Sequence, residues 1–286
     1  MLSVLTWNVQ GRVRTVPEQA AALSAWPADV VVLQEVRSTS AAAWTEALTA
    51  LGHVDILLSL PAGRPGADPA RRLGVLVAGA HPLRRLPAPD LPWAERYLAA
   101  EVATPDGPLV VHGLHVPTSA RADAVKVRTL EAVRDHVAGD DGVPVVVCGD
   151  LNTPQYESRE GEVRSFARTR TGRLREGFDE RHDRAELGLV PGLADHGFVD
   201  AFRAVHGYDA RDRSWIYPGR SHGYRLDHLF VRGARPVDAR YVHALREDGL
   251  SDHSALLAVL ELGRWRGRVR GPAGTVATTT LPSARR

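Results

Sequence analysis

Short runs of apolar residues recur along this chain of 286 residues, and most of them have the length of a β-strand. They are rich in β-branched side chains, and they predict strands at residues 2–7, 30–34, 73–78, 97–104, 108–114, 145–148, 226–231 and 255–260. Between the fourth and the fifth run, residues 104–107 combine a proline, a turn-forming acid and a glycine. This segment predicts an antiparallel hairpin with a short loop.

Helical patterns are fewer than strand patterns. Apolar residues share one helical face over residues 127–137, after a candidate N-cap at Ser119, and Gly139 ends this helix. Residues 17–25 and 41–51 also have a helical pattern. Helices dispersed among many strands, with at least one hairpin, favour an α/β sandwich with a mixed pair of sheets over a doubly wound parallel sheet.

Two segments differ from the rest of the chain. Residues 156–184 are charged and poor in apolar side chains, and they predict an exposed loop beside Asn152. The arginines of this loop either contact phosphate or are simply solvated, and the sequence leaves both interpretations open. Beyond Leu262 the chain is rich in Arg, Gly, Pro and Thr and cannot build a core. We therefore expect one domain over residues 1–262 and a disordered tail over residues 263–286.

Composition narrows the class of protein without selecting an activity. A hydrophobic content of 44% and a charged content of 24% are ordinary for a globular protein and argue against disorder and membrane spans. The net charge of +2 gives only weak support for an anionic partner. Lys126 is the one lysine, so almost every cation is an arginine, which suits bidentate phosphate contacts, although codon bias explains the preference better.

The remaining sequence-wide signals concern location and redox chemistry. Cys148 is the single cysteine and lies in an apolar run, so we expect a buried thiol and no intrachain disulfide. Met1 leads into the first strand without a charged leader or a cleavage site, and no window has the length of a transmembrane helix. A cytoplasmic location is the resulting expectation.

The most informative feature is a set of polar motifs at strand ends, at residues 6–8, 33–35, 115–117, 149–152, 225–228 and 251–253. Glu35 follows an apolar strand directly, and a hard cation such as Mg²⁺ takes one or two carboxylates of this kind. Asn8 ends the first strand with an amide that binds a metal-bound water, a phosphate or a carboxylate. Taken singly, each residue also has a purely structural interpretation. Glu35 could cap a helix or form a salt bridge, and Asn8 could form a turn.

The later motifs supply groups for proton transfer and charge stabilisation. Asp150 and Asn152 follow a strand across Gly149, where an aspartate can deprotonate water and an amide can hold a phosphoryl oxygen. Asp227 can fix the tautomer of His253 and keep it cationic. A lone histidine is more often structural, but the joint occurrence of all six motifs would require six coincidences.

This ordered set resembles the endonuclease/exonuclease/phosphatase superfamily over residues 2–262. The resemblance implies a four-layer αββα sandwich of two mixed, mainly antiparallel sheets, with Mg²⁺ at one edge and Mn²⁺ as a substitute. It implies hydrolysis of phosphate esters by in-line attack of water. Glu35 would be the principal metal ligand, assisted by Asn8 and Asp252.

Further roles follow from the same resemblance, motif by motif. Asp150 would position the nucleophilic water, and Asn152 and His253 would stabilise the charge that develops on phosphorus. Asp227 would orient His253. The joint presence of these residues argues against a third interpretation, a nucleic-acid or protein binding module that has lost its activity.

Within the superfamily, the chain is most similar to the branch of exonuclease III and the abasic endonucleases. Arg96 and Arg121 match DNA-contacting arginines of that branch, and Trp215 and Tyr224 match its pocket aromatics, although both aromatics fit a core equally well. His115 departs from the branch, which usually has a tyrosine there, and resembles deoxyribonuclease I and lipid phosphoesterases. We expect a monomeric DNA phosphodiesterase, with a lipid headgroup or small phosphorylated metabolite as the alternative substrate.

Overall fold

Our computed structural model describes residues 1–60, 73–118, 124–139, 142–217 and 219–263. Two sequence predictions, the N-cap at Ser119 and the DNA contact at Arg121, lie outside these residues, as does the predicted tail from residue 264 onward. No helix among the described residues is long and apolar enough to cross a membrane.

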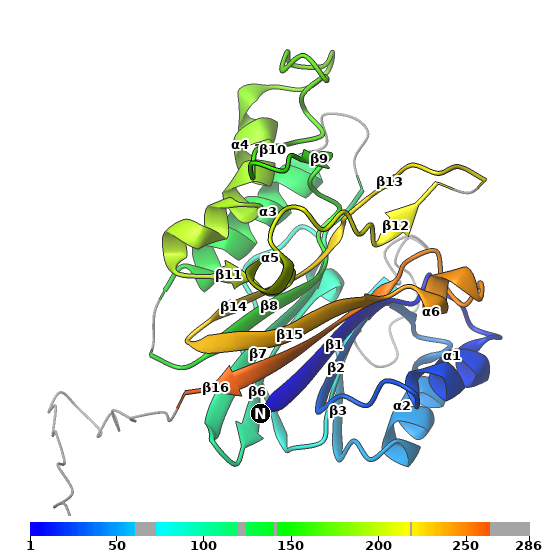
Figure 1. Ribbon diagram of the computed structural model, residues 1–286. Coiled ribbons are helices and arrows are strands. Elements are labelled where there is room, and N and C mark those ends of the chain that lie inside the picture. The colour runs from blue at the N-terminus through cyan, green and yellow to red at the C-terminus, as the bar shows by residue number, and fades with distance from the viewer. Residues whose placement is uncertain (61–72, 119–123, 140–141, 218, 264–286) are drawn as a thin grey trace, which may run out of the picture.

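Two six-stranded sheets form the centre of the molecule (Figure 1). Sheet 1 has the order β15 (Ala234–Val242), β16 (Ala255–Leu262), β1 (Leu2–Asn8), β2 (Val30–Arg37), β4 (Leu73–Gly79) and β3 (Asp55–Leu58). Sheet 2 has the order β11 (Val199–Asp200), β14 (Asp227–Arg232), β8 (Val145–Asp150), β7 (Gly107–His115), β6 (Tyr97–Thr104) and β5 (Leu83–Arg85). Only the pairs β1–β2 and β7–β8 are parallel among the strand pairs of the described residues, so both sheets are mixed and mainly antiparallel, as predicted.

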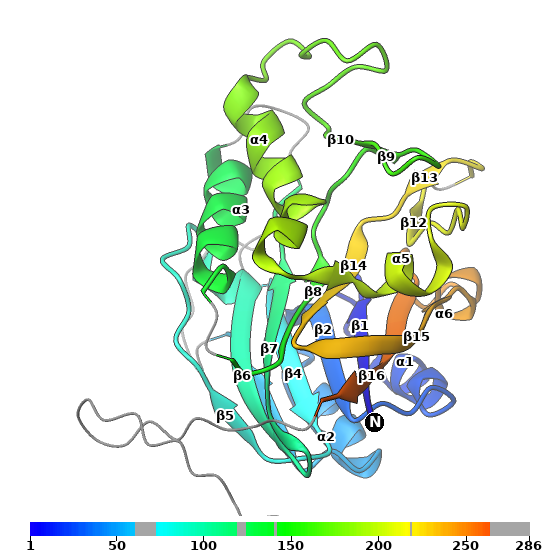
Figure 2. The ribbon, with the colours of Figure 1, turned by 60° about the vertical axis from the view of Figure 1, so that its left-hand side comes forward.

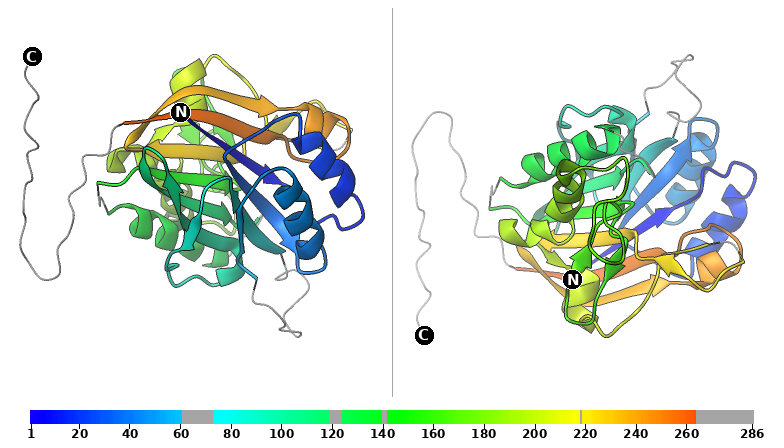
Figure 3. Two further views of the ribbon diagram at one scale, coloured as in Figure 1. Left: turned by 90° about the horizontal axis from the view of Figure 1, so that it is seen from below. Right: turned by 90° about the horizontal axis from the view of Figure 1, so that it is seen from above.

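Helices cover the outer faces of the two sheets (Figures 2 and 3). On sheet 1 lie α1 (Val16–Leu23) and α2 (Ala41–Ala50), and on sheet 2 lie α3 (Ala124–Val137) and α4 (Glu180–Leu189). One hydrophobic core fills the space between the sheets, and a second and a third lie under the helices on either side. The predicted four-layer αββα sandwich is therefore confirmed.

The strand predictions succeed because the central strands are buried on both faces. In β2, Val30 and Val32 belong to the core between the sheets, whereas Val31 and Leu33 pack under α1 and α2. A strand with this environment is a continuous apolar run and not an alternating one. The predicted hairpin is also confirmed, because β6 pairs with β7 as far as Thr104 and Gly107.

The prediction of an exposed loop over residues 156–184 is wrong in part. This segment contains the paired strands β9 (Tyr156–Glu157) and β10 (Val163–Arg164), and its last residues are the start of α4. Ser165 and Ala167 are fully buried, whereas residues 170–177 are mostly exposed. Backbone hydrogen bonds, such as that from the Thr169 N–H to the Arg173 carbonyl oxygen, and ion pairs, such as that between Arg168 and Asp183, order the segment without an apolar pattern.

The remaining elements are short. They are α5 (Ala201–His206), α6 (Ala244–Glu247), the 3₁₀ helices η2 (Ala94–Arg96) and η3 (Gly192–His196), and the paired strands β12 (Trp215–Ile216) and β13 (Gly223–Tyr224). Both short hairpins, β9–β10 and β12–β13, lie near the edge of the sandwich where the strands β1, β2, β7 and β8 end (Figures 1 and 2).

Candidate functional site

Strand direction and register bring the predicted residues to one edge of the sandwich. The parallel strands β7 and β8 end together, and β14 begins beside the end of β8 because it is antiparallel to it. As a result His115, Asp150 and Asp227 occupy one row across sheet 2, as direct Cα partners. On sheet 1, β1 ends at Asn8, and His253 lies two residues before the start of β16, which is antiparallel to β1.

Backbone irregularities aim two of these side chains. Glu35 has a left-handed φ of 61°, and the register of β2 shifts between Leu33 and Val36, so Glu35 lies in a β-bulge. A bulge turns a side chain away from the alternation of its strand, at some cost in strain. Gly149 has a φ of 140°, and a Cβ built on it would lie 1.9 Å from the Leu114 carbonyl oxygen. Only glycine therefore lets β8 approach β7 closely just before Asp150.

Asn8 connects the acids of the two sheets. Its Nδ2 donates to Asp150 Oδ2 at 3.0 Å and to Glu35 Oε1 at 3.2 Å, while its Oδ1 accepts from the backbone N–H of Gln10 at 2.9 Å. The predicted metal-binding amide thus turns its nitrogen toward the carboxylates. In this arrangement Asn8 positions Glu35 and Asp150 relative to each other.

His253 is held as a cation between two aspartates. Its Nδ1 lies 2.7 Å from Asp227 Oδ2, and its Nε2 lies 3.8 Å from Asp150 Oδ2. Burial alone would lower the pKa of His253, but the charges of Asp227 and Asp150 raise it to about 10. The imidazole is therefore protonated at neutral pH. Asp227 is itself held in place, because its backbone N–H donates a hydrogen bond to Ser214 Oγ at 3.0 Å.

Asp150 lies at the centre of the site and is 1% exposed. Burial and the charge of Asp227 raise the pKa of its carboxyl, and His253 and the hydrogen bond from Asn8 oppose this, so that the pKa lies at about 7. Its Oδ1 accepts from the Asn152 backbone N–H at 3.0 Å. A carboxyl with this pKa can gain and lose a proton near neutral pH.

His115 is neutral, in contrast to His253. Burial and the neighbouring cations Arg96 and His253 hold its pKa well below the usual range. Arg96 Nη1 lies 3.0 Å from both ring nitrogens, but a neutral imidazole has only one acceptor. Because Nε2 lies 3.6 Å from Glu35 Oε1 and 3.8 Å from Asp150 Oδ2, we place the proton on Nε2 and let Nδ1 accept from Arg96.

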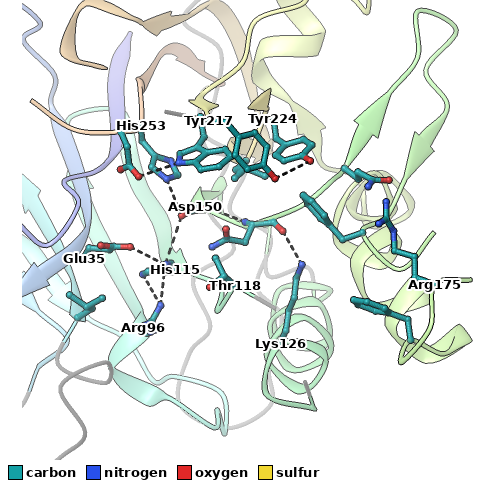
Figure 4. Close-up of a pocket in the computed structure, with 18 residues that line it drawn as sticks. Glu35, Arg96, His115, Thr118, Lys126, Asp150, Arg175, Tyr217, Tyr224 and His253 are labelled. Carbon is teal, nitrogen blue, oxygen red and sulfur yellow. Dashed lines mark hydrogen bonds and ion pairs between the residues drawn. The ribbon is translucent and has the colours of Figure 1, made fainter. Parts of the chain in front are cut away.

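These groups form one wall of a pocket with a volume of about 620 Å³ (Figure 4). The predicted residues that line it are Glu35, Arg96, His115, Asp150, Asn152, Trp215, Tyr224, Asp252 and His253. Asn8 and Asp227 lie behind this wall and are bonded to residues in it. The structure thus brings together all predicted site residues that it describes.

Several further pocket residues were not singled out from the sequence. Phe166 packs edge to face on Tyr224, with 5.0 Å between the ring centroids, and the Tyr217 hydroxyl lies 3.4 Å from that of Tyr224. Lys126 was noted only as the one lysine, yet it donates to the Asn152 carbonyl oxygen at 2.9 Å. Nothing in the local sequence marks these residues, because their role depends on contacts with distant elements.

Arg225 is part of a predicted motif, but its role is structural. Its guanidinium forms two 2.7 Å hydrogen bonds with Glu157 of β9 and lies 2.8 Å from Asp200 Oδ2. Arg203 also donates to Glu157, at 2.9 Å. This buried network fixes the β9 hairpin against the start of β14, and so supports Asp227.

Solved structures share this fold over nearly the whole chain. An endonuclease/exonuclease/phosphatase from Beutenbergia cavernae DSM 12333 is 25% identical with a TM-score of 0.68, over 92% of this chain and 72% of that one. An AP endonuclease from Archaeoglobus fulgidus is 21% identical with a TM-score of 0.69, over 92% and 100%. A 3′ phosphatase from Neisseria, bound to a product DNA hairpin, is 20% identical with a TM-score of 0.62, over 91% and 100%.

The sequence comparisons give the family. No curated protein matches the chain. The model of the Endonuclease/Exonuclease/phosphatase family matches residues 5–253, a range that holds every predicted site residue. The chain therefore belongs to the endonuclease/exonuclease/phosphatase family.

Proposed function

We propose that the chain is a Mg²⁺-dependent phosphodiesterase that cleaves DNA by in-line attack of water on phosphorus. Metal-dependent hydrolysis of a phosphate ester is the activity common to the family. The observation that carries the proposal is the pairing of an aspartate whose pKa is about 7, Asp150, with an imidazolium, His253, on the same pocket wall. A base for water and a fixed cation for the phosphate are both present.

The donor set at this edge fits a divalent cation. Burial raises the pKa of Glu35, and the nearby charge of Asp252 adds to the rise, while the Asn8 hydrogen bond and His253 oppose it. Mg²⁺ prefers oxygen donors of this kind and would relieve the repulsion between them. When bound, such a cation polarises phosphoryl oxygens and offsets their charge.

One set of residues among those described is close enough to offer three ligand atoms to one ion. Asp150, Asp227 and His253 present ligand atoms within 4.8 Å of one another. However, His253 Nδ1 donates a hydrogen bond to Asp227, and the pKa of His253 is about 10. Its Nε2 therefore carries a proton as well, and the imidazolium repels a metal cation. We assign the metal to Glu35 and Asp252 instead, with Asn8 holding Glu35 in place.

The chain's own residues supply proton transfer and charge stabilisation. Asp150 would take a proton from water, since Asn8 and the Asn152 backbone orient its two oxygens. His253 would face the developing negative charge, and Asp227 keeps its ring oriented and protonated. His115, as a neutral donor through Nε2, would hydrogen-bond an oxygen of the phosphate or of the leaving group.

DNA is the substrate that the pocket supports best. Aromatic rings from the β12–β13 hairpin line the side of the pocket away from Glu35, and aromatic faces bind nucleotides by stacking (Figure 4). Arg96 and Arg175 add positive charge. The second candidate, a small or lipid phosphoester, is favoured by His115 and by a pocket volume within the range of small-molecule sites.

The test is a substrate panel with Mg²⁺, with Mn²⁺ and with a chelator. It contains duplex, single-stranded and abasic-site DNA, a phospholipid and a simple phosphodiester. We expect metal-dependent cleavage of DNA that falls at least about 100-fold in Asp150→Asn and Glu35→Ala. Asp106→Asn, in the exposed turn at the opposite end of β7, is the matched control and should keep wild-type activity.

Two results would contradict the proposal. Full activity in Asp150→Asn would remove the assigned base. Cleavage of the phospholipid or the simple diester with no cleavage of any DNA would replace DNA by the second candidate.

A further inference from the structure

The five arginines in residues 164–175 differ in what they contact. Arg168 forms ion pairs with Asp183 at 2.8 Å and with Glu180. Arg164 stacks on the Tyr156 ring, with 4.7 Å from its guanidinium carbon to the ring centroid. Arg170, Arg173 and Arg175 are all exposed, but Arg170 and Arg173 are not among the described residues that line the pocket. Within this group of five, Arg175 alone lines the pocket.

Arg175 is held in place by neutral groups. Its backbone N–H donates to the Ala167 carbonyl oxygen at 2.9 Å, and its Nε donates to the Arg168 carbonyl oxygen at 3.0 Å. The side chain of Gln155 fits best with its amide oxygen toward Arg175 Nη2 and its nitrogen toward the Arg168 carbonyl oxygen. Among the described residues, no carboxylate forms an ion pair with Arg175, so its charge is fixed in position but not neutralised.

The other cations of the pocket are already engaged by the protein, and one of them, His253, is paired with Asp227 at 2.7 Å. Arg96 donates to His115, and Lys126 forms a 2.8 Å ion pair with Glu186. Arg175, in contrast, lies beyond the aromatic side chains that line the pocket, apart from Asp150 and on the far side from Glu35 (Figure 4). The charge of Arg175 acts on the aromatic side of the pocket. Burial and Tyr217 raise the pKa of Tyr224 to about 12, and the nearby charge of Arg175 opposes this rise.

From these contacts we infer that Arg175 is a binding site for a second phosphate of the substrate, one that is not cleaved. The inference rests on the proposed function, since the cleaved phosphate must lie at Asp150 and His253. A substrate that spans the pocket then needs an anion at each end and a stacking group between them. A nucleic-acid strand has this arrangement, and a planar guanidinium binds a phosphate through two parallel hydrogen bonds.

The test measures binding without cleavage, in the Asp150→Asn background. The probe is a fluorescently labelled single-stranded oligonucleotide, titrated by anisotropy over a range of salt concentrations. We expect Arg175→Ala to weaken binding at least about tenfold, and to reduce the salt dependence by about 0.7 in the slope of log K against log salt, the value for one phosphate of a single strand. Arg175→Lys should fall between the two, because it keeps the charge and loses the planar fork.

Arg173→Ala is the matched control, since it removes an equal charge two residues away and outside the pocket lining. We expect it to change binding less than about twofold. Equal losses in Arg173→Ala and Arg175→Ala would overturn the inference, because they would show a diffuse effect of loop charge. Unchanged binding in Arg175→Ala would overturn it also, while the proposed function would stand. Absence of binding in the parent protein would remove the proposed function and this inference with it.

Discussion

The buried pair of Lys126 and Glu186 connects the edge that carries the candidate site to the helices that cover sheet 2. Lys126 Nζ donates to Glu186 Oε1 at 2.8 Å and to the Asn152 carbonyl oxygen at 2.9 Å. Glu186 Oε2 accepts from Thr153 Oγ1 at 2.9 Å and from the Phe166 backbone N–H at 2.8 Å. We predict that Lys126→Met destabilises the protein and displaces Asn152.

The magnitude follows from the burial of the pair. The side chains of Lys126 and Glu186 are 3% and 2% exposed. Removing one partner of a buried ion pair costs about 3–5 kcal/mol, because the other charge stays desolvated. Two neutral donors still bind Glu186 in the variant, so we expect about 3 kcal/mol, the lower end of that range. Glu186→Gln, added to Lys126→Met, removes the unpaired charge and should recover about 1–2 kcal/mol.

Urea unfolding followed by tryptophan fluorescence measures both free-energy changes, from the midpoint and the slope. Arg128→Met is the matched control, because it removes a long cationic side chain from an exposed position of α3. It should shift the free energy of unfolding by less than about 0.5 kcal/mol. The reasoning is refuted if Lys126→Met costs under about 1 kcal/mol, or if the double variant is no more stable than the single one.

Three further predictions concern pH and backbone geometry. Asp227→Asn should lower the pKa of His253 from about 10, because burial then dominates, and an NMR titration of the imidazole measures this shift. The same variant should reduce the rate of hydrolysis at pH 8 at least about 100-fold, which a kinetic assay measures. Burial would raise the pKa of Glu157, but Arg225 lowers it to about 2. Roughly 3 kcal/mol of folding stability should therefore be present above pH 4.5 and be lost as the pH falls toward 2. Acid unfolding of Glu157→Gln should lack this pH dependence. Gly149→Ala should cost more than about 2 kcal/mol in urea unfolding, because its Cβ would overlap a carbonyl oxygen of β7.

Each of these three predictions has a clear contrary result. An unchanged His253 titration in Asp227→Asn would show that Asp227 does not hold the proton. Equal acid stability of wild type and Glu157→Gln would show that the ion pair with Arg225 adds nothing there. A Gly149→Ala protein as stable as wild type would mean that β8 can move away from β7 at little cost.

The pattern of hydrophobic residues did not predict helices and strands that bury polar groups or lie at the edge of a sheet. The strand β15 was not predicted, because it is an edge strand of sheet 1 and carries Pro236, Asp238 and Arg240. Edge strands commonly carry charge and proline, which hide the strand pattern. The helix α4 was missed for a related reason, since its buried face includes Asp183 and Glu186. Their partners lie on other elements and are invisible to a local pattern.

The candidate site was predictable because its groups follow strands. Glu35 comes directly after an apolar run and Asp150 follows one across Gly149, and short polar motifs in order along the chain indicated one shared site. The sequence predicted the cationic state of His253 through Asp227, but not the neutral state of His115. His253 is a cation because the charges of Asp227 and Asp150 outweigh its burial, whereas His115 is neutral because burial lowers its pKa and the cations Arg96 and His253 lower it further.

The amino-acid pattern alone specified the central strands, three of the six α-helices of the described residues and the residue types of the candidate site, because these depend on local periodicity and on motif order. Tertiary structure decided which residues meet. The register of β7, β8 and β14 forms the row across sheet 2, and the bulge in β2 aims Glu35. The packing of a distant segment places Arg175 in the pocket lining, whereas Arg168 of the same segment pairs with Asp183. Charge states and pocket walls arise from contacts between residues far apart in sequence, so they appear only when the sandwich closes.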